Sequence, residues 1–296
     1  MDLIETGDIS PDIQRPYVVS GEMSHGTFCR FREYVVTHLG IKMPDVKKTM
    51  LQGRLIKRLR ALGLDSYDVY YDYVFSPKGM EAELGHMIDA VTTNKTDFFR
   101  EPKHFEYLEQ VVLPDLLKHG PGIGSPCRFW SAGCSTGAEP YSLAMVLNEF
   151  ALQHRGFRYN ILATDISQRV LDEARAGIYT EAMVSPVPLY LRRKYLLRSK
   201  DSRENMVRII PELRAKMVFG RLNFMAEAFG LANSMNVIFC RNVLIYFDRG
   251  TQERVVNRLC RYLETGGYLF LGHSETLNGL EVPLIQEGPT IYRKMV

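Results

Sequence analysis

The stretch Arg128–Ser142, with the sequence RFWSAGCSTGAEPYS, decides the fold of this chain. A short apolar run enters a turn with glycines at positions 133 and 137, and Glu139 and Pro140 open a long segment with helical apolar spacing. Glycine lets the backbone approach a ligand closely, and proline at the start of a helix already has helical geometry. We therefore expect a strand, a ligand-contacting loop and a helix, as at the carboxyl end of a parallel strand in a nucleotide-binding sheet.

Two phosphate-binding motifs are missing from this turn. It contains neither the Gly-x-Gly-x-x-Gly of dinucleotide sites nor the Gly-Lys-Ser/Thr of triphosphate sites. A glycine turn without phosphate-binding groups suits a nucleoside cofactor such as S-adenosylmethionine. A nicotinamide oxidoreductase is a weaker alternative for the same reason.

Short apolar runs alternate with helical patterns through the rest of the C-terminal part. We expect strands at 128–132, 160–163, 217–222, 237–240 and 268–271, helices at 140–153, 167–176 and 251–263, and an antiparallel edge strand at 290–293. The glycines at 266 and 267 are expected to end the last helix. This alternation predicts a parallel sheet with right-handed crossovers. A basic, proline-containing stretch at 186–216 interrupts the rhythm and is expected to be an insertion.

The N-terminal part has a different pattern. Residues 1–20 show no periodicity and are expected to form a flexible tail. Apolar residues recur at helical spacing from about 24 to 76, and Gly63, directly after Leu62, is expected to end one of the helices. We expect a small helical domain at 21–79, a linker near its end, and an α/β domain at 80–296 that begins with a helix at 80–91.

Composition is that of a soluble globular protein. The 296 residues are 46% hydrophobic and 24% charged, enough for a full core in two structural units. The acidic N-terminus argues against a secretory signal, and no apolar run approaches the roughly 18 residues of a membrane span. The five cysteines have no Cys-x-x-Cys pair or zinc spacing, so we expect free thiols in a cytoplasmic protein and no bound metal.

Positive charge is clustered rather than evenly spread. Residues 42–60 carry seven basic side chains against one acid, and residues 192–216 carry nine Lys or Arg. In the first cluster Lys47, Arg54, Lys57 and Arg58 fall largely on one helix face, opposite the apolar positions. A basic face is often only solvated, but such a cluster also suits an acidic partner or nucleic acid.

Polar residues follow the predicted strands. Asp165 ends the second strand, where an acid can accept hydrogen bonds from ribose hydroxyls. The alternative is a helix cap, for which Ser167 is better placed. Glu139 either favours the helix dipole or holds a cationic cofactor tail.

A second polar segment, Thr92–Glu101, lies between predicted elements. It is either an ordinary capped helix start or a cofactor-lining loop, in which Asn94 and Thr96 contact the cofactor and Arg100 fixes a carboxylate. After the fourth strand, Tyr246 is either a packed aromatic or a hydroxyl aimed at the reacting group. The Asn- or Asp-Pro-Pro-aromatic turn of many amine-modifying methyltransferases is absent there.

Six motifs together resemble one family, the bacterial chemotaxis receptor methyltransferases (CheR). They are Arg54–Gly63, Thr92–Glu101, Ser131–Ser142, Ala163–Asp165, Phe239–Asp248 and Gly272–Glu275. Each alone is weak, but six in order from about residue 24 to the end are specific. The resemblance implies an all-helical N-terminal domain followed by a Rossmann-like methyltransferase domain with a small inserted β-subdomain at about 183–216.

The resemblance also implies a function and a set of site residues. The cofactor is S-adenosylmethionine, and the product is a glutamyl methyl ester on the cytoplasmic helices of a chemoreceptor; we expect a monomer, no nucleic acid and no membrane insertion. The implied cofactor contacts are Asn94, Thr96, Arg100, Gly133, Gly137, Glu139, Asp165, Asn223, Phe224, Asn242 and Val243. Arg100 and Tyr246 would lie nearest the methyl transfer, and Lys47, Arg54, Lys57 and Arg58 would bind the receptor.

The chemistry agrees with this resemblance. A glutamate carboxylate, with an ordinary pKa of about 4.3, is already ionised at neutral pH, so its methylation needs alignment and exclusion of water rather than a strong base. Two alternatives stay open, a nucleic-acid methyltransferase that uses the basic clusters and a non-catalytic signalling module that binds S-adenosylmethionine. Some relatives dock a receptor C-terminal pentapeptide on the β-subdomain with a glycine-containing loop. The matching loop here, 198–205, has no glycine, so the resemblance leaves the use of that tether open.

Overall fold

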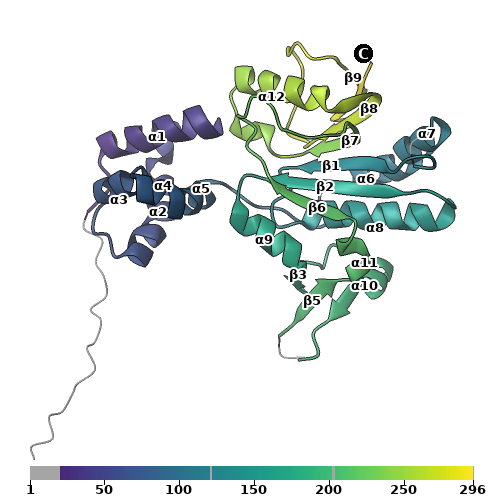
Figure 1. Ribbon diagram of the computed structural model, residues 1–296, viewed down its shortest axis with the longest axis horizontal. Coiled ribbons are helices and arrows are strands. Elements are labelled where there is room, and N and C mark those ends of the chain that lie inside the picture. Colours follow the sequence, from purple (N-terminus) through teal and green to yellow (C-terminus); the bar gives the residue numbers. More distant parts are fainter. Residues whose placement is uncertain (1–20, 121, 202–203, 296) are drawn as a thin grey trace, which may run out of the picture. The chain divides into compact units, whose positions relative to one another are not determined.

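The computed structural model describes residues 21–120, 122–201 and 204–295, so the expected N-terminal tail lies outside the described residues. Contacts divide these residues into two compact units (Figure 1). One contains residues 21–31 and Pro44–Val91, and the other contains Arg32–Met43 and everything from Thr92 onward. The division falls after residue 91 rather than after residue 79, because α5 packs against α2 in the first unit.

The first unit is helical, as expected. It contains the first half of α1 (His25–Leu39), η1 (Asp45–Lys47), α2 (Lys48–Leu62), α3 (Tyr67–Val74), α4 (Pro77–Ala82) and α5 (Leu84–Val91). The apolar positions Phe28, Phe31, Leu51, Leu55 and Leu59 are fully buried. Gly63 ends α2 with a φ of 65°, the left-handed conformation that glycine adopts without strain.

The helix expected at 80–91 is instead two helices that break at Glu83. The Glu83 side chain is 2% exposed, and its carboxylate accepts two hydrogen bonds from Arg58, at 2.8 and 2.7 Å, and one from the Tyr70 hydroxyl at 2.9 Å. A buried carboxylate needs such partners. The break therefore places Glu83 beside the guanidinium of α2.

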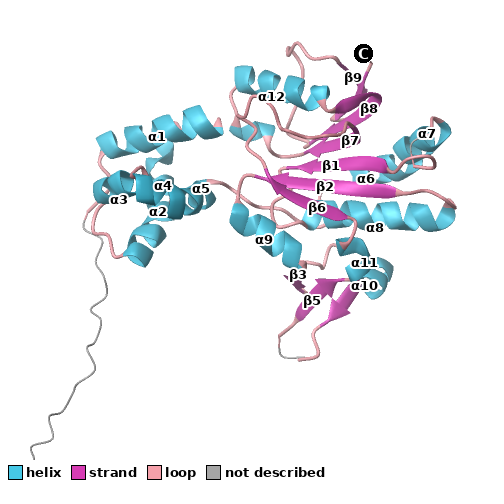
Figure 2. Cartoon of the chain, viewed as in Figure 1, coloured by secondary structure: helices cyan, strands magenta, loops and turns pink. Residues whose placement is uncertain are grey.

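The second unit contains a seven-stranded sheet in the order β6-β2-β1-β7-β8-β10-β9 (Figure 2). Its strands are β1 (Cys127–Ala132), β2 (Tyr159–Asp165), β6 (Met217–Arg221), β7 (Met235–Cys240), β8 (Leu263–Leu271), β9 (Leu284–Gly288) and β10 (Ile291–Lys294). The first five are parallel, and β10 pairs antiparallel with β8 and β9. The Rossmann-like α/β fold expected from the sequence is confirmed.

Alternate residues of each central strand enter different cores. Phe129, Phe239 and Phe270 pack on the face covered by α8, whereas their neighbours Trp130 and Cys240 pack on the face covered by α12. Both sets are buried, which explains why these strands read as continuous apolar runs. The flanking helices are α6 (Pro102–Tyr107), the π-helical turn η2 (Leu108–Val112), α7 (Leu113–Lys118), α8 (Ala138–Gln153), α9 (Gln168–Ala176) and α12 (Arg249–Arg261).

Two expectations near the C-terminus are wrong. The edge strand is β9, and β10 lies between it and β8. Gly266 and Gly267 do not end a helix, since α12 ends before Tyr262 and both glycines lie within β8. A Cβ on Gly267 would lie 2.8 Å from the carbonyl oxygen of Asn236, so this glycine permits close approach of two strands.

The insertion forms a small antiparallel sheet in the order β3-β5-β4. Its elements are β3 (Ile178–Thr180), α10 (Leu189–Tyr195), β4 (Leu196–Arg198), β5 (Met206–Ile209) and α11 (Pro211–Arg214). The sheet thus begins several residues before the expected start at about 183. No helix among the described residues has the length and apolar character needed to cross a membrane.

Two helical glycines of the first unit give a matched test of packing. A Cβ on Gly79 would lie 1.8 Å from the carbonyl oxygen of Tyr73, whereas one on Gly85 would meet nothing within 4 Å. We expect Gly79→Ala to lower the free energy of unfolding by about 1–3 kcal/mol through overpacking. Gly85→Ala should raise it by up to about 1 kcal/mol, because alanine favours helix. Urea unfolding of the full chain, monitored by circular dichroism, measures both changes. Equal changes in the free energy of unfolding would contradict the close packing of Gly79 against Tyr73.

Candidate active site

The polar residues predicted from the sequence gather where neighbouring parallel strands end. The adjacent strands β2, β1, β7 and β8 end at Asp165, Ala132, Cys240 and Leu271. The chain runs from β1 to β2 and β6 on one side of β1 and then crosses to β7 and β8 on the other side. Open parallel sheets bind ligands at such a switch point, here between β1 and β7. The loops after these four strands, together with the segment before α6, form the site described below.

The glycine turn after β1 has left-handed backbone at three positions. Gly133, Ser135 and Gly137 have φ values of 86°, 50° and 93°. A Cβ on Gly133 would lie 2.5 Å from a methyl group of Val243, so this glycine lets the loop after β7 pack onto the turn. A Cβ on Gly137 would lie 2.8 Å from the Tyr179 hydroxyl, so Gly137 allows close packing at the start of α8.

Asp165 connects this turn to the end of β2. One carboxylate oxygen accepts a hydrogen bond from the Ser135 N–H at 2.9 Å, and the other accepts one from the Ser167 N–H at 3.0 Å. Ser167, not Asp165, caps α9 through a bond from the Val170 N–H. The alternative of Asp165 as the cap is therefore excluded, and its role toward ribose remains a prediction.

Arg241 is the buried centre of the site, and sequence reasoning did not single it out. Its side chain is 2% exposed and lies between two carboxylates, Glu101 at 2.9 Å and Glu139 at 3.2 Å. It also donates to the carbonyl oxygen of Arg100. The second oxygen of Glu139 accepts from the Ser131 hydroxyl at 2.7 Å. The one available signal was a single arginine directly after the apolar run Val237–Cys240, since an arginine buried at the end of such a strand needs acidic partners.

The pKa values of Glu139 and Glu101 shift in opposite directions. Burial raises the pKa of Glu139, against the opposing charge of Arg241. Burial would also raise the pKa of Glu101, but hydrogen bonds and charge from Arg241 hold it below its ordinary value. With both acids ionised, the three groups carry one net negative charge, which suits a cationic ligand.

The segment before α6 is tied to this site through its backbone. The carbonyl oxygen of Asn94 accepts from the Ser135 hydroxyl at 2.7 Å, and the Phe99 N–H donates to the Ser142 hydroxyl at 2.9 Å. Phe99 and Glu101 have φ values of 51° and 56°, conformations that persist only where the surroundings enforce them.

This arrangement is not an ordinary capped helix start. The helix begins at Pro102 after Glu101, so neither Asn94 nor Thr96 caps it. The Asn94 amide donates to the Thr92 hydroxyl at 3.4 Å, and Thr96 is partly buried. The cofactor contacts of Asn94 and Thr96 remain predictions.

Asn242, after β7, is held by two acids. It has a φ of 59°; its N–H donates to Glu275 at 2.9 Å, and its amide donates to Glu101 at 3.3 Å. Glu275 also accepts from the N–H of Gly272 at 2.6 Å and of Ile245 at 3.3 Å. Burial raises the pKa of Glu275, while these backbone donors oppose the rise. Glu275 thus fixes the loop that carries Asn242.

Four further candidates have less decisive surroundings. The Asn223 amide donates to the carbonyl oxygen of His38 at 2.8 Å, and Phe224 packs among aromatic side chains. Tyr246 is partly buried at the end of η3 (Leu244–Tyr246). A long 3.4 Å contact joins the Arg100 guanidinium to the carbonyl oxygen of Lys95. Direct roles for these residues stay predictions.

The basic residues of α2 are not equivalent. Arg54 donates to the carbonyl oxygen of Val91 at 2.6 Å, and Arg58 forms the buried pair with Glu83. Lys57 is exposed, and Lys47 is partly exposed. Two of the four predicted receptor contacts therefore also stabilise the helical unit.

Comparison with known proteins matches both units. The model of the CheR methyltransferase SAM binding domain matches residues 94–292, and that of the CheR methyltransferase all-alpha domain matches residues 26–92. The chain belongs to the CheR methyltransferase family. Membership confirms the predicted class of enzyme, a chemotaxis protein methyltransferase that uses S-adenosylmethionine.

Individual relatives agree with the family match. A chemotaxis protein methyltransferase of Borreliella burgdorferi is 41% identical over 84% of this chain and 88% of its own length. That of Escherichia coli is 37% identical over 91% of each chain. Among solved structures, the citrinin polyketide synthase CMeT domain overlaps 86% of this chain and 65% of its own at 17% identity and a TM-score of 0.38, a likeness too weak to add to the assignment.

Arg241 gives a test of the buried charge arrangement. Arg241→Met leaves two buried carboxylates without a counter-ion, so we expect it to lower the free energy of unfolding by about 3–5 kcal/mol at pH 7. Without the guanidinium the pKa of both acids rises, and the folded state binds more protons than the unfolded state. The loss should therefore shrink as the pH falls toward about 5.

Lys103→Met is the matched control, because Lys103 pairs with Glu106 at 2.9 Å on the surface. We expect it to change stability by less than about 1 kcal/mol. Denaturant unfolding of each variant across this pH range measures both effects. A deficit for Arg241→Met that does not depend on pH would contradict the account.

Proposed function

We propose that this chain transfers the methyl group of S-adenosylmethionine to glutamate side chains of a chemoreceptor's cytoplasmic helices, forming glutamyl methyl esters in the cytoplasm. The observation that carries the proposal is the anionic group of side chains at the strand ends, in a chain of the CheR family. It offers acids for a cationic cofactor and, in Arg100, a cation for a carboxylate substrate.

The residues present fit the cofactor. Asp165 has the position of a ribose-binding acid, and Glu139, Glu101 and Arg241 together leave one negative charge beside the glycine turn. Bound S-adenosylmethionine would supply an activated methyl group on a positively charged sulfur. Gly133 and Val243 keep the turn compact, while Glu275 holds Asn242 at its edge.

The nucleophile in this proposal comes from the substrate. The thiols of Cys134 and Cys240 lie nearby, but burial raises the pKa of both well above the ordinary value, so neither supplies a thiolate. A glutamate carboxylate needs no such activation. The chain's own residues then have to orient the carboxylate and exclude water.

Arg100 and Tyr246 are proposed for that orientation. The guanidinium of Arg100 has five donors, and its long contact with Lys95 leaves most of them for a carboxylate. The Tyr246 side chain is partly buried, and its hydroxyl is proposed as a further hydrogen-bond donor. Arg100 lies in the segment whose backbone carbonyl binds Arg241, and Tyr246 lies in η3, shortly after Arg241 in the sequence.

The product distinguishes this reaction from its alternatives. We expect radiolabelled S-adenosylmethionine and receptor cytoplasmic fragments to give labelled protein that releases methanol in alkali, because esters are base-labile. An N-methyl group would stay on the protein. Label that is stable to alkali, or that enters RNA or DNA instead, would overturn the proposal in favour of the nucleic-acid alternative.

The exposed part of the α2 surface is proposed to meet the acidic receptor helices. We expect Lys57→Glu to reduce receptor methylation about three- to tenfold through charge repulsion, with cofactor affinity unchanged. Lys78→Glu, at an exposed position in α4, is the matched control. Steady-state kinetics over a range of salt concentrations measure both variants. Lys57 is the better test because changing Arg58 would also break its pair with Glu83. Equal effects of the two variants would exclude a local receptor contact at α2.

A further inference from the structure

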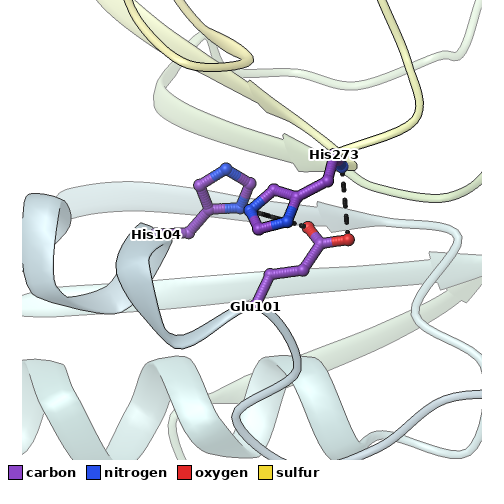
Figure 3. A group of neighbouring side chains, drawn as sticks. All are labelled: Glu101, His104 and His273. Atoms are coloured by element: carbon purple, nitrogen blue, oxygen red, sulfur yellow. Dashed lines mark hydrogen bonds and ion pairs between the residues drawn. The ribbon is translucent and has the colours of Figure 1, made fainter.

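Three side chains converge beside the buried ion pairs of Arg241: Glu101, His104 and His273 (Figure 3). Glu101 directly precedes α6, His104 lies in its first turn, and His273 follows β8. Each side chain offers one ligand atom, and these atoms all lie within 4.8 Å of one another. The three residues are called the His–Glu cluster below.

His104 has a buried ring nitrogen without a hydrogen-bond partner among the described residues. Its ring is 2% exposed, and Nε2 lies 3.0 Å from the Thr290 hydroxyl. Nδ1 is buried, has no hydrogen-bond partner, and faces a carboxylate oxygen of Glu101 at 3.5 Å. That distance is too long for a hydrogen bond. A buried ring nitrogen left in this way is rare and requires an explanation.

His273 is held over the same carboxylate. Its backbone N–H donates to one oxygen of Glu101 at 3.2 Å, and its Nε2 lies 4.0 Å from the other oxygen. The two imidazole rings lie 5.1 Å apart at 82° to each other. The side chain of His273 is 52% exposed, so the cluster is open to solvent on that side.

The surrounding chemistry favours a cation. Glu101 shares Arg241 with Glu139, so the neighbouring charges sum to minus one when both acids are ionised. The bond from His104 to Thr290 orients the ring, as outer hydrogen bonds do for metal-binding histidines. Two imidazole nitrogens and one carboxylate suit Zn²⁺ and related first-row ions, whereas Mg²⁺ and Ca²⁺ prefer oxygen alone.

We propose that Glu101, His104 and His273 form a binding site for one divalent transition-metal ion, with Zn²⁺ as the ion that the donor set fits best. The ion meets the unpartnered Nδ1 and connects the start of α6 to the loop after β8. A small turn of the exposed His273 ring closes the remaining distance. Because the ion binds the folded arrangement, it stabilises the fold.

The test uses untagged full-length protein freed of metal by chelator. Cys29 and His25 lie 3.5 Å apart on α1 and offer Zn²⁺ a second place, so every protein carries Cys29→Ser. Calorimetric titration with Zn²⁺ should show one tight site. His273→Gln, at an exposed position, should weaken that site at least about tenfold.

His119→Gln is the matched control, because His119 pairs with Asp115 at the same 3.5 Å but belongs to no three-residue cluster among the described residues. It should keep the parent affinity. Zn²⁺ should raise the melting temperature of the parent and of His119→Gln, and should do so much less for His273→Gln. Absence of binding, or binding that His273→Gln leaves unchanged, would overturn the proposal.

Discussion

The burial of one guanidinium organises the active site. Arg241 follows a central strand, is almost fully enclosed, and can be tolerated there only with charged partners. Those partners, Glu101 and Glu139, come from the loop before α6 and from the first turn of α8. Because Glu101 also binds Asn242 and the backbone of His273, one ion-pair network joins loops from distant parts of the sequence.

This network accounts for the strained backbone on either side of Arg100, whose carbonyl oxygen accepts a hydrogen bond from Arg241. Phe99 and Glu101 both adopt left-handed backbone, and the carbonyl oxygen of Arg100 between them accepts from Arg241. The strain turns the Arg100 backbone inward, and the ion pairs offset its cost. Function and stability are therefore coupled here: the acids that give the site its negative charge also hold the loops in place.

Much of the fold could be predicted because its signals are local. Apolar runs, the glycine turn and the Ser167 cap identified the parallel strands and helices within a few residues. The errors occurred where a contact with a residue distant in the sequence determines the local structure. Glu83 interrupts a helix and pairs with Arg58, and Gly267 allows a neighbouring strand to pack closely. In the site, Asp165 was predictable from its place after a strand. Arg241 was not, since its two acids lie 102 and 140 residues away.

The central claim is that the acids at the strand ends hold a cationic methyl donor, with Asp165 on its sugar. Calorimetric titration of S-adenosylmethionine into the purified chain and into Asp165→Asn tests it most directly, with circular dichroism to confirm that both are folded. The account predicts one cofactor per chain and an affinity at least about tenfold weaker for the variant, as expected for loss of a charge-assisted hydrogen bond. Equal affinity in both proteins, or no binding by the unchanged chain, would contradict it.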